Sequence, residues 1–503
     1  MILQHLAILQ VMLPLLAAPL CLLTRSPLLA WGISALAGLF ALAGSFILFA
    51  QVLNAGVISY HIGNWAPPWG IEFRLDAANS FVLVVISLVG AVCILYGRRS
   101  IEREIPEDDQ PLFYTMLLLC FAGMLGVTST GDAFNLFVFL EIFSLSSYVL
   151  VAMGAERDRR ALTAAFTYLL LGTIGATFYV IGLGFVYALT GTLNMADMAV
   201  RITGMGGSGT LRVAFAFMII GMGLKLAIFP MHLWLPNAYA FAPSIVTALL
   251  AGTATKVALY VLLRILFTIF SPAYPFEAQT LQYLFLPLGL AGVFVASIVA
   301  LFQQDVKRLL AWSSIAQSGY FLLGVSFASV GGLMASIVHL FNHAIMKSGL
   351  FLAVGCVVYR TGSCSIASFR GLGHKMPWTM AAFVIGGLSM IGIPATIGFT
   401  SKWYLILAAL ERGWWPVAIA IVAGSLLALF YFGRIIEAAY LQPSTGDSVI
   451  TEAPLSMLAP LWMLTISCLA LGIDSELTVS AARAAAEALF LAPHAGLPAH
   501  TGP

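Results

Sequence analysis

Charge is the scarcest property of this chain. Only 9% of its 503 residues are charged, against about 25% in soluble globular proteins, while 61% are apolar. Such a chain has too few polar side chains to cover a water-facing surface, so we expect the lipid bilayer to be its main surroundings. The net charge of +2 provides no basic surface for nucleic acid, and we expect no nucleic-acid partner.

Cysteine is also sparse, and the known cofactor motifs are missing. No C-x-x-C pair occurs, so neither a zinc ribbon nor an iron–sulfur site is suggested. Glycine-rich phosphate loops, G-x-S-x-G elbows and dinucleotide fingerprints are absent from suitable loops. We therefore expect no metal, no cofactor and no enzyme acting alone. The cysteines are interpreted as packing residues: Cys21, Cys93, Cys120, Cys356, Cys364 and Cys468.

Long apolar runs predict an all-α membrane protein with about fourteen transmembrane helices. The first run has no basic region before it and no cleavage site, which indicates a retained helix. Two runs contain helix breakers, Pro230 with Pro236 and Pro394 with Gly398, so we expect two broken helices. The runs are 5–23, 28–53, 76–97, 111–130, 132–153, 162–189, 211–235, 243–270, 282–302, 309–328, 331–358, 377–411, 416–440 and 454–473.

The order of the runs suggests an internal repeat. Residues 111–270 and 282–440 each hold five runs, one of them broken, and an odd number makes the second copy enter the membrane inverted. Residues 1–110 would supply three further helices, and residues 441–503 a last helix with a short tail. Alternate loops on one side carry thirteen Lys and Arg residues, against five on the other. The positive-inside rule then places both termini in the periplasm or its equivalent.

Four lysines lie inside apolar runs, where each costs roughly 2.5 kcal/mol or more to insert. Lys225, Lys256, Lys347 and Lys402 are therefore functional candidates. The alternative is that a lysine caps a free carbonyl at a broken helix, chiefly Lys225 and Lys402. Arg264 lies near a helix end, from which it could reach the interface.

Carboxylates within the runs are rarer. Glu141 is the clearest, and pairing with a lysine is the simplest expectation; a protonated Glu bonded to a neighbouring helix is the alternative. Glu437 lies three residues from Arg434, which fits an interfacial ion pair or a transport role. Asp132 is predicted to cap a helix.

Histidines form the remaining candidates. His339, His343 and Lys347 follow one another at intervals of four, so they share one helix face, as a proton relay through bound water requires. No carboxylate or Cys accompanies them, so a metal is not expected. Satisfied core histidines remain the alternative. His232 lies in a proline-rich break, where it could line a cavity or stabilise the loop.

Several ordered motifs resemble the proton-translocating antiporter-like subunits shared by respiratory complex I, membrane-bound hydrogenases and Mrp-type Na+/H+ antiporters. The motif around Glu141, the lysine directly after GF-x-S and the short tail most resemble the MrpD-like subunits of Mrp antiporters. The motifs are TGDAFNLFVFLEIFSLSSYVLV, FPMHLWLPNAYAFAPSIVTALLAGTATKVALYVLLR, FQQDVKRLLAWSSIAQSGY, HLFNHAIMKSGLFL and GIPATIGFTSKWYL.

The resemblance implies a proton-translocating subunit of a multisubunit Na+/H+ antiporter in a prokaryotic plasma membrane. Its partners would be other small hydrophobic subunits, and it would carry H+ within a complex that exchanges Na+. A proton-pumping subunit of a complex I-like oxidoreductase or hydrogenase is the alternative. Residue by residue, the resemblance implies that Glu141 pairs with Lys225, Lys256 continues the axis, His339 or His343 links the halves, Lys402 ends the second half, and Asp305 has a structural role.

Overall fold

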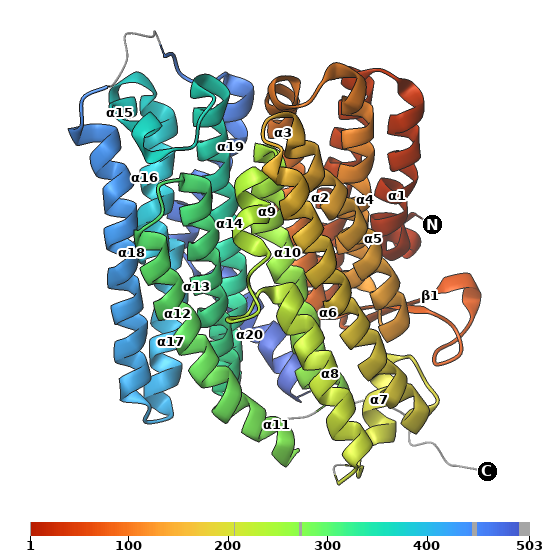
Figure 1. The fold of residues 1–503 in the computed structure, drawn as a ribbon. Helices are drawn as coiled ribbons and strands as arrows, with labels where there is room; N and C mark the ends of the chain where they lie inside the picture. The colour runs from red at the N-terminus through yellow and green to blue at the C-terminus, as the bar shows by residue number, and fades with distance from the viewer. Residues whose placement is uncertain (1, 206, 271–273, 445–449, 492–503) are drawn as a thin grey trace.

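The computed structural model describes residues 2–205, 207–270, 274–444 and 450–491 as a tall bundle of helices (Figure 1). Among these residues, twelve helical segments are long and apolar enough to cross a membrane. The helix α13 and the pair α16–α17 occupy the two remaining predicted runs. Each of the fourteen runs therefore corresponds to a helix, and the predicted all-α class is confirmed.

The elements follow in chain order. The first part contains η1 (Ile2–His5), α1 (Leu6–Thr24), α2 (Pro27–Ala55), β1 (Ile58–His61), η2 (Ile62–Asn64), β2 (Glu72–Leu75), α3 (Ala77–Glu104) and η3 (Glu107–Asp109). The next contains α4 (Gln110–Ser129), α5 (Ala133–Ala152), η4 (Met153–Glu156), α6 (Arg160–Thr190), α7 (Met195–Ile202), α8 (Gly209–Leu226), α9 (Leu235–Phe241), α10 (Ser244–Arg264) and η5 (Ile265–Ile269).

The second half continues with a similar series. It contains α11 (Pro275–Gln279), η6 (Thr280–Phe285), α12 (Leu286–Leu301), α13 (Val306–Ser326), α14 (Val330–Thr361), η7 (Ile366–Phe369), α15 (Leu372–Lys375), α16 (Pro377–Ile391), α17 (Ile397–Glu411), α18 (Trp415–Leu441), α19 (Leu455–Ile473) and α20 (Glu476–Leu491). The short strands β1 and β2 pair antiparallel in a hairpin beside the bundle.

Aspartates begin two of the membrane helices. As predicted, Asp132 caps α5, because its Oδ1 accepts hydrogen bonds from the backbone N–H of Phe134 at 3.0 Å and of Asn135 at 2.7 Å. Asp76 caps α3 in the same way. Each carboxylate satisfies N–H groups that a helix leaves free at its start.

The first predicted break is confirmed between α8 and α9. The helix stops at Leu226, where Ala227 adopts a left-handed backbone with φ of 57°. Helix resumes only at Leu235. The carbonyl of Leu224 accepts from the indole Nε1 of Trp234 at 2.9 Å as well as from the backbone N–H of Ala227 at 3.2 Å, so the segment after the break is tied back to the end of α8.

The second break is confirmed between α16 and α17, but Gly398 does not lie in it. Gly392, with φ of 92°, ends α16, and helix resumes at Ile397. Gly398 instead permits close packing, because a Cβ there would lie 1.7 Å from the carbonyl oxygen of Ser389. The glycine thus lets α17 rest against the end of α16.

The chain after residue 473 forms a helix where only a tail was expected. Helix α20 packs against α3 and α14. Its buried face consists mostly of alanines, such as Ala482, Ala485 and Ala486, together with Val479 and Leu489. Alanines form no long apolar run, so the sequence pattern did not reveal a packed helix here.

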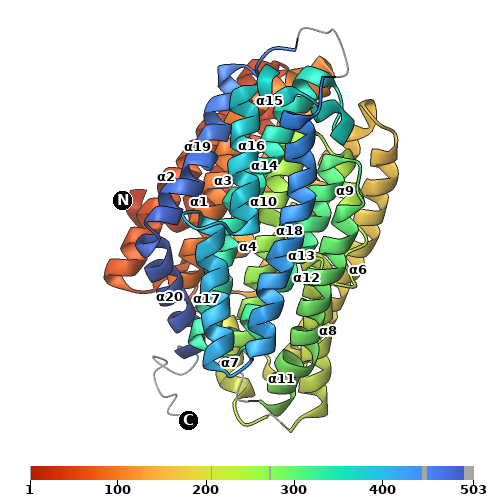
Figure 2. The same ribbon diagram turned by 90° about the vertical axis from the view of Figure 1, so that its left-hand side faces the viewer.

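Two helices form the centre of the bundle. Every residue of the apolar windows of α10 and α14 is buried. They pack against each other, α10 also contacts α3 and α8, and α14 also contacts α13, α16 and α17 (Figures 1 and 2). Since α10 and α14 belong to different predicted repeats, the two halves meet along this contact. The boundaries of the repeats remain a prediction.

Candidate functional site: a buried line of basic residues

Lys225 lies at the end of α8, directly before the first break. Its Nζ donates to Oγ of Ser144 at 2.7 Å and to the hydroxyl of Tyr148 at 3.4 Å, both on α5. The ammonium group is therefore held by the neighbouring helix and does not cap the carbonyls of its own. This arrangement places the charge between α5 and α8, in the interior of the first half.

Glu141 faces the same lysine. The Nζ of Lys225 lies 3.8 Å from Oε1 of Glu141, which is an ion pair without a direct hydrogen bond. The side chain of Glu141 is 26% exposed, whereas that of Lys225 is 5% exposed. The carboxylate thus links the buried lysine with the outer face of α5.

Two further lysines lie at the centre of the bundle, and no carboxylate of the described residues is bonded to them. Lys256, on α10, donates to the carbonyl of Ala251 and to Oγ1 of Thr255. Lys347, on α14, donates to the carbonyl of Leu310 and to Oγ of Ser313, both at 2.8 Å. Both lysines are fully buried. An isolated buried ammonium is costly, so these positions differ from ordinary helix packing.

The two histidines of α14 lie between these lysines and the second break. Their rings are nearly parallel, with centroids 6.0 Å apart. Nδ1 of His339 lies 2.9 Å from Oγ of Ser401 on α17. Within the described residues, Nε2 of His339 and both ring nitrogens of His343 have no hydrogen-bond partner although they are buried. Imidazole nitrogens can donate and accept protons near neutral pH, so the two histidines stay candidates for a proton relay.

Lys402 lies on α17, just after the second break. Its Nζ donates to the carbonyls of Met390 and Ile391, both at 2.9 Å, at the end of α16. It also lies 5.2 Å from the ring centre of Tyr320. The capping contact anticipated for a lysine at a broken helix is therefore present here, and it places a positive charge at the negative end of α16.

These residues, called the buried line below, lie on helices that pack successively against one another, α8 on α10, α10 on α14 and α14 on α17. Lys256 is within electrostatic range of His339, His343 and Lys347, and Lys402 is within range of His339. The line therefore continues from α10 through α14 to α17. Lys225 reaches the same interior from α8, which packs against α10.

The secondary candidates lie elsewhere. His232 is buried in the first break, stacked on Phe229 with centroids 5.3 Å apart, and packs edge-on against Trp312. Glu437 is exposed and accepts a hydrogen bond from Gln442 at 3.2 Å.

The expected pair of Glu437 with Arg434 is not formed in the described chain. Arg434 donates instead to the backbone carbonyls of Leu301 and Gln303. The arginine therefore satisfies carbonyls at the end of α12 and does not bind the carboxylate.

Asp305 has a structural position at the start of α13. Its Oδ1 accepts a hydrogen bond from the backbone N–H of Arg308 at 2.9 Å, and its Oδ2 accepts one from Sγ of Cys364 at 2.8 Å. Burial and this carboxylate raise the pKa of the Cys364 thiol to about 12. The contact joins two loops at one end of the bundle.

The sequence interpretation missed the residues that hold the lysines and histidines. They are serines and tyrosines, which are common in apolar helices and carry no distinguishing pattern: Ser144, Tyr148, Ser313, Ser401 and Tyr320. The sequence interpretation also missed the pair of Asp76 with Arg264. The sequence indicated this pair only through the position of Asp76, which is the first residue of the run 76–97. Arg264 is buried and paired with Asp76 at 2.7 Å, and its reach to the membrane interface stays a prediction.

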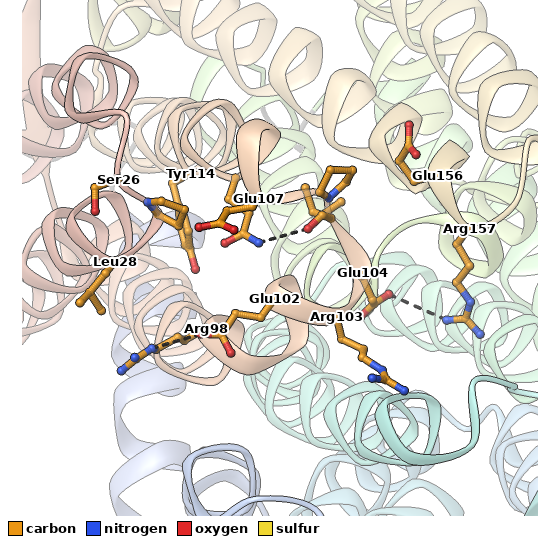
Figure 3. Close-up of a pocket in the computed structure, with 14 residues that line it drawn as sticks. Ser26, Leu28, Arg98, Glu102, Arg103, Glu104, Glu107, Tyr114, Glu156 and Arg157 are labelled. Carbon is orange, nitrogen blue, oxygen red and sulfur yellow. Dashed lines mark hydrogen bonds and ion pairs between the residues drawn. The ribbon is translucent and has the colours of Figure 1, made fainter.

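A large pocket lies away from this line. It measures about 830 Å³ and is lined by charged ends of helices, including Arg98, Arg103, Glu104 and Arg157 (Figure 3). None of the predicted site residues lines it. Among the described residues, no group of three or more His, Cys, Asp and Glu side chains could hold a metal ion.

The fold and the buried line define a multi-pass membrane protein whose interior holds a chain of ionisable side chains. Residues 130–428 match the family model described as NADH:quinone oxidoreductase/Mrp antiporter, TM. The chain belongs to this family.

Relatives from both branches of the family resemble the chain over most of its length. It is 41% identical to the N subunit of NADH-quinone oxidoreductase from Desulforudis audaxviator, covering 95% of this chain and 97% of the relative. It is 31% identical to the D subunit of the Na(+)/H(+) antiporter from Alkalihalophilus pseudofirmus, covering 87% and 88%. A chain of the Mrp complex from Dietzia superposes with a TM-score of 0.88 at 26% identity, covering 97% and 98%.

Proposed function

We propose that this chain is the proton-translocating subunit of a multisubunit monovalent cation (Na+)/H+ antiporter. The observation that carries the proposal is the contact of Lys225 with Glu141 at the first break, from which a buried line of bases continues into the second half. A transporter needs groups that change their charge inside the membrane, and such groups are retained at these positions at a cost in stability.

The mechanism follows from the distance within the pair. At 3.8 Å the carboxylate stabilises the charged lysine by Coulomb attraction. When the two separate, Lys225 loses that support and passes its proton towards Lys256. Lys256 acts electrostatically on His343 and Lys347. A change of charge on α10 therefore changes the proton affinity of these two side chains on α14. His339 and Lys402 complete the path, which behaves as a set of coupled titrations.

Companion subunits belong to this proposal. Glu141 is partly exposed on a face of α5 that also exposes Val138, Leu145 and Val149. A carboxylate in such an apolar stripe is costly against lipid alone, and a neighbouring subunit would cover it. We propose small hydrophobic subunits as partners, a prokaryotic plasma membrane as the location, and both termini on its outer side.

A redox-driven proton pump is the second candidate, and the 41% identity to a subunit of NADH-quinone oxidoreductase favours it. The same buried line would serve a complex I-like oxidoreductase or a membrane-bound hydrogenase, because the source of energy lies in other subunits. Purification in mild detergent separates the two. Small hydrophobic companions alone support the antiporter, whereas flavin-binding or iron–sulfur companions support the pump.

The role of the site is tested in inside-out vesicles that contain the whole complex. Glu141→Gln and Lys225→Ala are expected to abolish proton-coupled cation exchange, measured with a pH-sensitive dye, while the companion subunits still co-purify. Glu437→Gln is the matched control, because it neutralises an exposed carboxylate. Full exchange by either Glu141→Gln or Lys225→Ala would refute the assignment.

A further inference from the structure

The C-terminal end of α10 carries a second polar cluster. Arg264 donates from Nε to the hydroxyl of Tyr260 at 2.9 Å, from Nη1 to Oγ1 of Thr268 at 3.2 Å, and from Nη2 to Oδ1 of Asp76 at 2.7 Å. The arginine and Tyr260 are buried. A π-helical segment, η5, follows directly.

This cluster lies in line with the proposed proton path. Lys256, Tyr260 and Arg264 follow one another at intervals of four on the same helix, so they lie along one face. Eight residues of α-helix place Arg264 about 12 Å from Lys256 along the axis. These three positions therefore mark one face of α10 from the centre of the bundle to the end of the helix, while the ammonium of Lys256 itself bonds back to the carbonyl of Ala251.

The chemistry of the arginine closes this face to protons. A guanidinium group has donors only and stays charged, so it cannot accept a proton from Tyr260 and pass it on. Its fixed positive charge also repels an approaching proton, as arginines do in water-selective pores. Asp76, at the start of α3, is the more exposed partner, with a side chain 16% exposed against 8% for Arg264.

We propose that Arg264, held by Asp76, is an electrostatic barrier. It prevents protons at Lys256 from leaking to the C-terminal end of α10. Protons are thereby directed sideways to the histidines of α14. This inference rests on the proposed proton path. The alternative is a purely mechanical clamp, in which the ion pair only fastens α3 to α10.

Passive proton leak separates the barrier from the clamp. The complete complex is reconstituted in liposomes with a trapped pH dye, and proton entry under an imposed voltage is measured without sodium. Arg264→Met is expected to raise proton entry severalfold and by no more than about tenfold, the effect of a unit charge at a distance of about 12 Å with an effective dielectric constant of about 20. Arg264→Lys and Asp76→Asn keep the positive charge at position 264 and are expected to leave proton entry as low as in the unchanged complex.

The controls decide the remaining outcomes. Arg157→Met removes another ion pair between segments, with Glu104 at 3.9 Å, and is expected to cause no leak. Arg264→Gln replaces Arg264→Met if that variant does not assemble. The barrier would be refuted if neither Arg264→Met nor Arg264→Gln increased proton entry. It would also be refuted if Asp76→Asn increased proton entry as much as they do. Because leak is measured without turnover, this result is independent of the exchange assay on Glu141.

Discussion

Gly398→Ala tests how closely the second break is packed. The added Cβ would lie 1.7 Å from the carbonyl oxygen of Ser389 and 2.7 Å from its carbonyl carbon. Ordinary carbon contacts lie near 3.5 Å, so α16 and α17 must separate by more than 1 Å. Both contacting groups are backbone and cannot turn away. We therefore expect a loss of about 3 kcal/mol, at the upper end of overpacking effects.

The loss can be measured as a change in unfolding temperature. With an unfolding entropy of about 2.1 cal/mol/K per residue, 3 kcal/mol corresponds to a decrease of about 3 °C. Exchange should also fall by roughly tenfold, because a shift of about 1 Å moves the carbonyls that hold Lys402. Gly433→Ala is the control, since no atom lies within 4 Å of the Cβ position there. An unchanged unfolding temperature in Gly398→Ala, beside an equally unchanged control, would refute the packing argument.

Two further predictions concern single polar contacts. Ser313→Ala removes the hydroxyl that accepts a 2.8 Å hydrogen bond from Lys347. Cation exchange should become about tenfold slower, which corresponds to the loss of one charge-assisted hydrogen bond. Exchange at the normal rate would show that this contact does not contribute to transport. Because burial and Asp305 raise the pKa of Cys364 to about 12, its thiol is uncharged at pH 8 and should react slowly with a maleimide. Asp305→Asn lowers that pKa and should speed labelling, while an equal rate would indicate that burial alone controls the thiol.

Much of the architecture follows from the sequence, because a bilayer admits few folds. Each long apolar run must be a helix, since backbone groups have no water to bond in hydrocarbon. The prolines near residue 230 and Pro394 predicted both breaks, because proline interrupts the backbone hydrogen bonds of a helix. The polar face of α14 was readable from the spacing of His339 and His343, because helical geometry is local.

The partners of those residues needed the tertiary structure. Nothing in the pattern of α5 marks Ser144 as the residue that holds Lys225, because any serine in a helix could face lipid or a neighbour. The exact place of the second break also depended on packing, since Gly398 serves the approach of two helices and not the turn. Helix α20 is stable through its contacts with α3 and α14, which its alanine-rich sequence does not reveal.

The sequence by itself therefore determined the class of protein, the spans and the rare charged side chains buried within them, because inserting charge in lipid is costly and such residues stand out. The tertiary structure decided which charges meet. It brought Glu141 within 3.8 Å of Lys225, bonded Lys256 to the backbone carbonyl of Ala251, and paired Arg264 with Asp76. Distances between helices depend on packing of the whole bundle, and no local pattern contains them.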